Sequence, residues 1–262
     1  MCGIVGYIGS RPALGIVING LKRLEYRGYD SAGIAINDGE KTQIFKCAGR
    51  VRDLEEMVNG KDVSGTIAMG HTRWATHGEP NEINAHPQVS YRGHFIVVHN
   101  GIIENYARIK RHLEGRDVRF TSQTDTEVLA NLMEHLYLEG DLSAEQAIIM
   151  ALNKVEGTYG IAVFCRDEPG RMFAARQGSP LVIGVGEGEN FIASDATPIV
   201  EHTQRVIYLN DDDLAVISKD EMVLKAIKNK PFEPDVKKVD LKIGEIDKEG
   251  YPHFMLKEIF EQ

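Results

Sequence analysis

Short apolar segments alternate with polar stretches along the chain, and their lengths distinguish expected strands from expected helices. Four segments of strand length lie in the first part of the chain, at residues 2–8, 31–37, 42–47 and 66–71. Apolar residues at helical spacing predict a helix over residues 13–24, and a shorter helix is expected over residues 51–58. Asp38-Gly39, between the second and third strands, is typical of a tight hairpin.

The middle of the chain is predominantly helical and precedes a second strand-rich region. Helices are expected near residues 106–113, 126–138 and 144–155, and short strands separated by Gly, Pro and Asp turns from 159 to about 224. Hairpins outnumber any β-α-β alternation, which predicts an antiparallel α+β layered fold rather than a doubly wound sheet. The charged, proline-containing tail predicts a domain over residues 1–227 and an extended arm or linker over 228–262.

Charge and composition exclude several classes of protein. The formal net charge of −9 argues against a nucleic-acid partner, because phosphate contacts need a basic surface. No apolar run approaches the roughly 18 residues that indicate a membrane span. The amino terminus lacks the basic start and apolar stretch of a signal peptide. We therefore expect a cytoplasmic protein with neither a nucleic-acid nor a membrane partner.

Cys2 differs by position from the other two cysteines. Cys47 and Cys165 lie in strand-like runs, where a cysteine is usually a small buried hydrophobe. Removal of Met1 would give Cys2 a free α-amino group, whose reference pKa of about 7.7–8.0 suits a general base. Nucleophile and base would then belong to one residue. The alternative is a small residue that merely begins a buried strand.

The segment at residues 71–78, His-Thr-Arg-Trp-Ala-Thr-His-Gly, follows an expected strand and concentrates polar groups in a loop. Arg73 could hold a carboxylate through its planar fork, or form a surface ion pair. Trp74, the only tryptophan, is by default a core anchor. Five histidines between residues 71 and 99 raise the question of zinc, but no His-Glu-x-x-His or paired-cysteine pattern is present, so we expect no metal site.

Two further positions could carry chemistry. Asn100-Gly101 is flanked by apolar residues, which favours a hairpin turn; an amide side chain and a backbone N–H there could also serve an oxyanion. Thr124 and Glu127 have the spacing of a capping box, which places Asp125 in the first turn of a helix. Asp125 could then receive a substrate ammonium group, or simply complement the helix dipole.

Taken together, these segments resemble the class II glutamine amidotransferases, which belong to the N-terminal nucleophile hydrolases. The segments that carry the resemblance are residues 2–6, 25–33, 71–80, 84–87, 98–105, 124–128, 178–184 and 252–262. An initial Cys-Gly-Ile alone would be weak support, but the full set in this order is very specific. The resemblance implies a four-layer αββα sandwich of two antiparallel sheets.

The resemblance also implies a reaction and its catalytic residues. Cys2 would attack the side-chain amide of L-glutamine and form a γ-glutamyl thioester, with its own α-amino group as the base. Asn100 and the N–H of Gly101 would form the oxyanion hole. The products would be L-glutamate and ammonia, and neither a cofactor nor a metal ion is implied.

Further roles follow from the same resemblance. Arg73 would hold the α-carboxylate of glutamine and Asp125 its α-ammonium group. Thr76 and His77 would line the loop that closes over glutamine, and Trp74 would lie towards the passage by which ammonia leaves. The segment at residues 25–33 would mainly build the core around the site.

The family members most similar to this chain continue into a sugar isomerase domain, which would be the partner of this one. The ammonia would then serve synthesis of glucosamine 6-phosphate from fructose 6-phosphate, and we expect the full-length enzyme to be a homo-oligomer. Another class II amidotransferase, such as asparagine synthetase or the phosphoribosyl-pyrophosphate enzyme, is an alternative, although those carry different residues around 27–31. A glutamine sensor without catalysis on the same fold is a second alternative.

Overall fold

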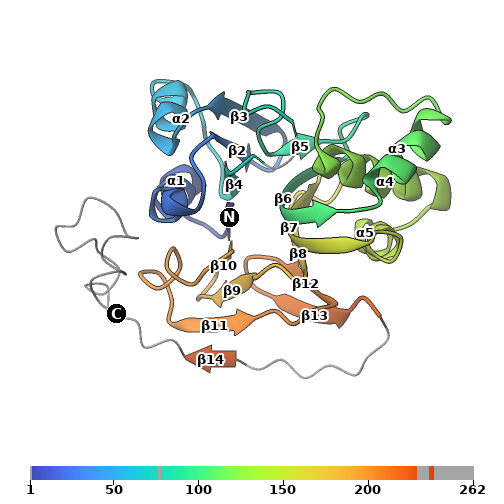
Figure 1. The fold of residues 1–262 in the computed structure, drawn as a ribbon. Coiled ribbons are helices and arrows are strands. Elements are labelled where there is room, and N and C mark those ends of the chain that lie inside the picture. The colour runs from blue at the N-terminus through green and yellow to red at the C-terminus, as the bar shows by residue number, and fades with distance from the viewer. Residues whose placement is uncertain (1, 76–77, 229–235, 239–262) are drawn as a thin grey trace, which may run out of the picture.

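The structure, a computed structural model, describes residues 2–75, 78–228 and 236–238, and these form two antiparallel sheets flanked by helices (Figure 1). In spatial order, the eight described strands of one sheet are β14 (Val236–Lys238), β11 (Arg205–Tyr208), β9 (Val182–Val185), β10 (Asn190–Ala193), β1 (Gly3–Ile8), β4 (Ile67–Arg73), β2 (Ser31–Asn37) and β3 (Thr42–Ala48). The six described strands of the other are β13 (Met222–Ala226), β12 (Asp213–Ile217), β8 (Met172–Gln177), β7 (Gly157–Cys165), β6 (Phe95–Ile103) and β5 (Gln88–Val89). The predicted antiparallel α+β class is confirmed.

Two groups of helices cover the outer faces of the sheets. The helices are α1 (Ala13–Leu24), α2 (Val51–Val58), α3 (Tyr106–Glu114), α4 (Asp125–Gly140) and α5 (Ala144–Leu152), with a short 3-10 turn, η1 (Glu25–Arg27), after α1. α1 and α2 pack on the eight-stranded sheet, and α3, α4 and α5 pack on the six-stranded sheet. A third apolar core lies between the two sheets and contains strand and loop residues only. The order helix, sheet, sheet, helix confirms the expected four layers.

The central strands are buried on both faces, which accounts for their continuous apolar sequences. In β1, Ile4 and Ile8 belong to the core between the sheets, whereas Val5 and Tyr7 belong to the core beneath α1. Successive side chains of a strand point to opposite faces, so each strand contributes to both cores. The polar residues that interrupt this pattern at strand ends are therefore conspicuous.

The expected hairpin turn at Asn100-Gly101 is wrong, because β6 continues through both residues. Asn100 pairs with Gly160 and Gly101 with Tyr159 in the ladder between β6 and β7. The φ angle of Gly101 is 137°, and a Cβ there would lie 2.1 Å from the carbonyl oxygen of Thr158. Glycine is thus required by the close approach of β7 and by a backbone conformation that L side chains rarely adopt. The expected hairpin at Asp38-Gly39, between β2 and β3, is confirmed.

The amino terminus of α4 is capped by Thr124, as its sequence predicts. The Thr124 hydroxyl accepts a hydrogen bond from the backbone N–H of Glu127 at 3.2 Å, and Asp125 is the first residue of the helix. The reciprocal half of the predicted capping box is absent. The Glu127 carboxylate instead accepts from the backbone N–H groups of Thr121 and Ser122, at 2.7 and 2.6 Å, and so holds the preceding loop.

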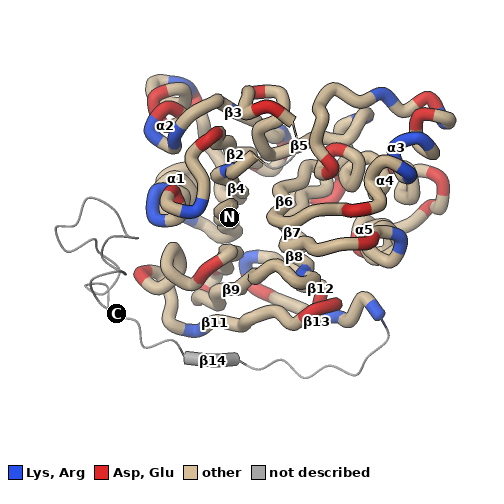
Figure 2. Tube along the Cα trace, in the orientation of Figure 1, with Lys and Arg blue, Asp and Glu red and all other residues tan. Residues whose placement is uncertain are grey.

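The surface and the tail complete the described part of the molecule. Charged residues lie mainly on the helices and connecting loops (Figure 2). Within the described ranges, none of the helices combines the length and the apolar character that crossing a bilayer requires. Of the predicted arm, Val236–Lys238 pairs with β11, and the remainder from residue 229 lies outside the described residues.

Substitution of two glycines compares a close contact between a loop and a sheet with an open position in a helix. A Cβ on Gly33 in β2 would lie 2.1 Å from the carbonyl oxygen of His86, so Gly33→Ala should destabilise the fold by about 1–3 kcal/mol. Gly15 in α1 is exposed and a Cβ there meets nothing within 4 Å, so Gly15→Ala should stabilise it by about 0.5–1 kcal/mol. Urea unfolding measures both. Equal stability of the two variants would contradict the close packing of the His86 loop on β2.

Candidate active site

Cys2 lies immediately before β1, at the centre of the eight-stranded sheet. The antiparallel pairing of β1 with β4 aligns Gly3 with Thr72, which brings Cys2 beside the residues that follow β4. The backbone N–H of Trp74 donates to the Cys2 sulfur at 3.2 Å, and the thiol lies 3.6 Å from the Trp74 carbonyl oxygen. Two segments about 70 residues apart in sequence thus meet at one sulfur atom.

The Cys2 thiol requires help to ionise near neutral pH. Burial raises the pKa of Cys2, and this outweighs the Trp74 N–H and the positive charges of Arg73 and Arg27, which lower it. Both hydrogen bonds of the sulfur within the described part of the chain involve the backbone of Trp74. A nucleophilic role for Cys2 therefore needs a base from elsewhere, because no described side chain hydrogen-bonds to its sulfur.

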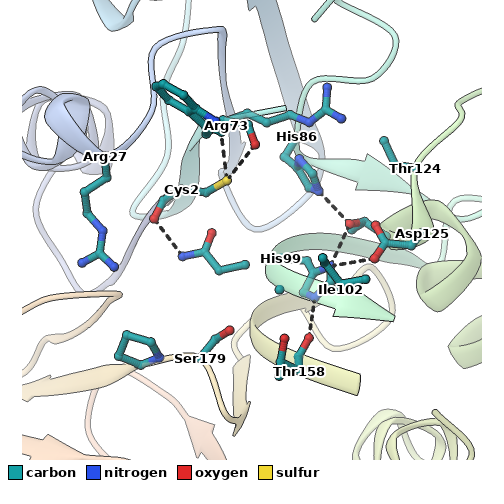
Figure 3. Close-up of a pocket in the computed structure, with 15 residues that line it drawn as sticks. Cys2, Arg27, Arg73, His86, His99, Ile102, Thr124, Asp125, Thr158 and Ser179 are labelled. Atoms are coloured by element: carbon teal, nitrogen blue, oxygen red, sulfur yellow. Dashed lines mark hydrogen bonds and ion pairs between the residues drawn. The ribbon is translucent and has the colours of Figure 1, made fainter. Parts of the chain in front are cut away.

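Cys2 opens into a cavity of about 320 Å³. Figure 3 shows its sulfur directed into the pocket, with Thr124 and Asp125 on the far side. The described residues that line it are Cys2, Arg27, Arg73, Trp74, His86, His99, Asn100, Gly101, Ile102, Thr124, Asp125, Thr126, Thr158, Ser179 and Pro180. The cavity thus combines a thiol, two guanidinium groups, a carboxylate and several hydrogen-bonding groups.

Arg73 and Asp125 give the cavity wall two opposite charges. Arg73 ends β4 and is buried; its pKa is lowered by burial, while Cys2, Asp125 and Asp30 raise it. An arginine nevertheless stays protonated in proteins. One carboxylate oxygen of Asp125 accepts from the backbone N–H of Ile103 at 2.8 Å, which orients the group. A zwitterionic ligand would find a partner for each of its charges.

Asn100 and Gly101, near the end of β6, line the cavity close to Cys2. The Asn100 side-chain nitrogen donates to the carbonyl oxygen of Cys2 at 3.1 Å. Its side-chain oxygen lies 3.0 Å from Nε2 of His71. An amide nitrogen is therefore held next to the thiol, where it can donate to a negatively charged oxygen.

Three buried histidines lie at the cavity, His86 and His99 in its lining and His71 next to them, and sequence reasoning missed their arrangement. The rings of His71 and His86 are 4.3 Å apart. His86 and His99 both hydrogen-bond to the Thr126 hydroxyl, at 2.7 and 3.0 Å, and His99 also contacts the Thr158 carbonyl oxygen at 3.3 Å. In residues 2–75, 78–228 and 236–238, no group of three or more His, Cys, Asp or Glu side chains could hold a metal ion. Three of the five histidines clustered in sequence thus make hydrogen bonds at the cavity, whereas His94 bonds to Asp167 and His77 lies outside the described residues.

Six predicted site residues line this one cavity, namely Cys2, Arg73, Trp74, Asn100, Gly101 and Asp125. Thr76 and His77 lie outside the described residues. Trp74 is not a core anchor: it is 46% exposed and makes an edge contact with Tyr29 at 5.4 Å. The expectation that Trp74 is a core anchor was therefore wrong, because the burial of a single aromatic side chain depends on its neighbours in space.

The segment at residues 25–33 contributes more to the site than core packing. Arg27 lines the cavity, and the Asp30 carboxylate accepts from the backbone N–H of Ala75 at 2.8 Å. Asp30 thereby holds the turn that carries Trp74. The dense polar sequence Tyr-Arg-Gly-Tyr-Asp was the available signal, because charged residues are seldom placed in a core without a partner.

Comparison with known proteins gives the family of the chain. Residues 71–201 match the family described as glutamine amidotransferase domain, and the chain belongs to this family, as a class II glutamine amidotransferase with the fold of the N-terminal nucleophile hydrolases. A solved structure of glutamine phosphoribosylpyrophosphate amidotransferase from B. subtilis is 27% identical and superposes with a TM-score of 0.75. The similarity covers 87% of this chain and 50% of that one.

Two curated relatives are similar over the whole chain. Both are named glutamine–fructose-6-phosphate aminotransferase (isomerizing): one from Bacteroides thetaiotaomicron is 53% identical, and one from Chlorobaculum tepidum is 50% identical. Each alignment covers 100% of this chain but 43% of the relative. The chain therefore spans less than half the length of these relatives.

Thiol reactivity tests the position of Cys2. Cys47 and Cys165 are buried, and burial raises the pKa of Cys165 to about 11, so iodoacetamide should modify Cys2 first. In protein that retains Met1, the raised pKa of Cys2 leaves little thiolate at neutral pH. Its alkylation rate should rise with pH, with a midpoint above the ordinary value of about 8.5. Peptide mass spectrometry measures each rate; a midpoint below that value, or equal labelling of all three thiols, would contradict the assignment.

Proposed function

We propose that this chain hydrolyses L-glutamine to L-glutamate and ammonia, with Cys2 as the nucleophile. The observation that carries the proposal is the position of the Cys2 sulfur in a cavity whose wall holds Arg73 and Asp125. A free amino acid carries one carboxylate and one ammonium group, and these two residues offer the complementary charges. Membership of the glutamine amidotransferase family supports glutamine as that amino acid.

The reaction proceeds in two steps through a thioester. The Cys2 sulfur attacks the side-chain amide carbon of glutamine, the carbon–nitrogen bond breaks, and the nitrogen leaves as ammonia after gaining a proton. Water then attacks the γ-glutamyl thioester, which releases glutamate and returns the proton to the thiol. The α-amino group of Cys2, free once Met1 is removed, takes and returns these protons. The raised pKa of the thiol and its lack of a described side-chain base support this assignment.

Asn100 and Gly101 stabilise the oxyanion that each step forms. The Asn100 nitrogen already lies beside Cys2, and Gly101 lines the same cavity. Two N–H donors aimed at a developing negative charge are worth several kcal/mol of transition-state stabilisation, about 10²–10³-fold in rate for each donor.

Arg73 binds the α-carboxylate of glutamine and Asp125 its α-ammonium group. The Ile103 N–H holds one oxygen of Asp125 and leaves the carboxylate at the cavity wall. Thr76 and His77 complete the loop over glutamine, and the exposed Trp74 marks the side on which ammonia leaves. The roles of Arg73, Asp125 and Trp74 apply the family resemblance to residues that line this cavity. Thr76 and His77 lie outside the described ranges.

In the whole protein we infer that ammonia passes to a sugar isomerase domain, where it converts fructose 6-phosphate to glucosamine 6-phosphate. The names of the two relatives, and the 57% of their length that this chain does not match (100% less the 43% covered), support this division. Residues 228–262 then connect residues 1–227 to that domain. Three free cysteines favour a cytoplasmic location, and we expect the full-length enzyme to be a homo-oligomer.

Removal of Met1 should switch the activity on. While Met1 remains, the nitrogen of Cys2 is an amide without a basic lone pair, and Met1 would also obstruct the reacting amide. Loss of the general base should reduce turnover by about 10²–10⁴-fold. The test is to prepare both forms, confirm each amino terminus by mass spectrometry, and measure glutamate release.

Cysteine variants of the Met1-free form complete this test. Cys2→Ala should abolish turnover and Cys2→Ser should retain little, since a hydroxyl is a much weaker nucleophile near neutral pH. Cys165→Ala, at a buried position remote from the cavity, is the matched control and should stay active. Equal turnover with Met1 retained would rule out the free-amine mechanism. Glutamine binding without turnover would favour a sensor.

Arg73→Lys tests recognition of the α-carboxylate. Lysine keeps the charge but loses the bidentate fork, so KM for glutamine should rise about 10- to 100-fold while the protein stays folded. Arg52→Lys is the control, because the Arg52 side chain is 76% exposed in α2 and lies outside the cavity lining. Steady-state kinetics with circular dichroism measures both; an unchanged kcat/KM in folded Arg73→Lys would remove Arg73 from the site.

A further inference from the structure

The side-chain amide of Asn100 has two chemically opposite ends, and only one suits an oxyanion hole. An amide nitrogen donates hydrogen bonds to a developing oxyanion, whereas an amide oxygen would repel it. The two ends are nearly equal in size, so packing alone does not select the orientation. A polar neighbour of Asn100 must therefore hold the nitrogen towards Cys2.

His71 provides that restraint through hydrogen bonds that allow one arrangement of protons. Its Nε2 lies 3.1 Å from the carbonyl oxygen of His99 and 3.0 Å from Oδ1 of Asn100. A carbonyl oxygen only accepts, so Nε2 must carry a proton, which it shares between the two oxygens. At the other end of the amide, Nδ2 donates to the carbonyl oxygen of Cys2 at 3.1 Å. The carbonyl oxygen of His99, acting through His71, and the carbonyl oxygen of Cys2 thus require the same orientation of the Asn100 amide.

The surroundings of His71 keep it a neutral donor. Its side chain is fully buried against the ring of His86, and its Nδ1 has no hydrogen-bond partner within the described residues. A charged ring would place a second N–H at Nδ1, where no described acceptor meets it. Burial accordingly lowers the pKa of His71 to about 3, so the ring stays uncharged near neutral pH.

We propose that His71 is a positioning residue, whose Nε2–H holds the side-chain oxygen of Asn100 so that the amide nitrogen faces Cys2. One N–H of that nitrogen bonds the Cys2 carbonyl, and the second is left for the oxyanion. His71 itself does not line the cavity, so its contribution passes through Asn100. The inference rests on the proposed glutaminase function and on the part that Asn100 takes in it.

Two substitutions of His71 separate its hydrogen bond from its bulk. In the Met1-free protein, His71→Phe keeps a ring but removes the donor, so kcat should fall about 10- to 100-fold while KM for glutamine changes less than about 3-fold. His71→Gln should recover most of kcat, because its amide nitrogen can replace Nε2. His112→Phe, on the exposed face of α3, should leave both constants unchanged.

A double-mutant cycle distinguishes positioning from general support of the fold. In an Asn100→Ala background, His71→Phe should cause no further loss, because the group that His71 positions is gone. A second loss of similar size there would overturn the inference, and so would full kcat in His71→Phe alone. Absence of Cys2-dependent turnover in the unsubstituted protein would instead overturn the proposed function.

A measurement without substitution keeps the inference testable if His71→Phe does not fold. A long-range ¹H–¹⁵N NMR spectrum of the unsubstituted protein should show His71 as a neutral ring with its proton on Nε2 near neutral pH. A neutral ring with its proton on Nδ1 would leave Nε2 unable to donate to Asn100 and would overturn the inference directly.

Discussion

The alternation of side chains in strands that are buried on both faces is the constraint on which the site depends. In β4, Met69 belongs to the core between the sheets, so His71, two residues further on, faces the same layer. In β6, Val98 and Asn100 are related in the same way. His71 and Asn100 therefore meet across the gap between the sheets, beside Cys2. A register slip of one residue in either strand would turn its polar side chain to the face of the sheet that packs against the helices.

Burial of polar groups in this layer determines which charges the site can hold. A charged group taken from water is costly unless it is paired, so His71 and His86 have their pKa lowered by burial and remain neutral near neutral pH. Hydroxyl, amide and imidazole groups in this layer hydrogen-bond to one another, as His71 does to Asn100 and His86 to Thr126. The opposite charges of Arg73 and Asp125 remain at the wall, where a ligand can reach them. A neutral and rigid background of this kind strengthens the interactions of both charges with a bound zwitterion.

Local sequence patterns predicted the helices and strands well but misjudged two positions, Asn100-Gly101 and Trp74. The predicted strand at residues 66–71 extends to Arg73, and that extension brings a residue of the cavity wall into the ladder. Asn100-Gly101 has the composition of a turn, yet glycine is needed there because β7 approaches closely. Amino-acid composition cannot tell whether a glycine serves a turn or allows a neighbouring strand to approach closely. Trp74 is exposed for a similar reason, since its environment is made by Tyr29 and Cys2, which are distant in sequence.

The sequence by itself determined the family, the antiparallel α+β class and six residues of the cavity, because ordered motifs and the period of apolar residues are local properties that need no coordinates. Tertiary structure alone decided which polar groups meet. The pairing of His71 with Asn100, and of Asp30 with Ala75, joins segments that are 29 and 45 residues apart. Such contacts depend on the register between strands and on how the two sheets stack, and neither is encoded in the spacing of any one segment. For that reason a histidine that resembled a metal ligand in the sequence became, in the folded protein, the neutral partner of an asparagine.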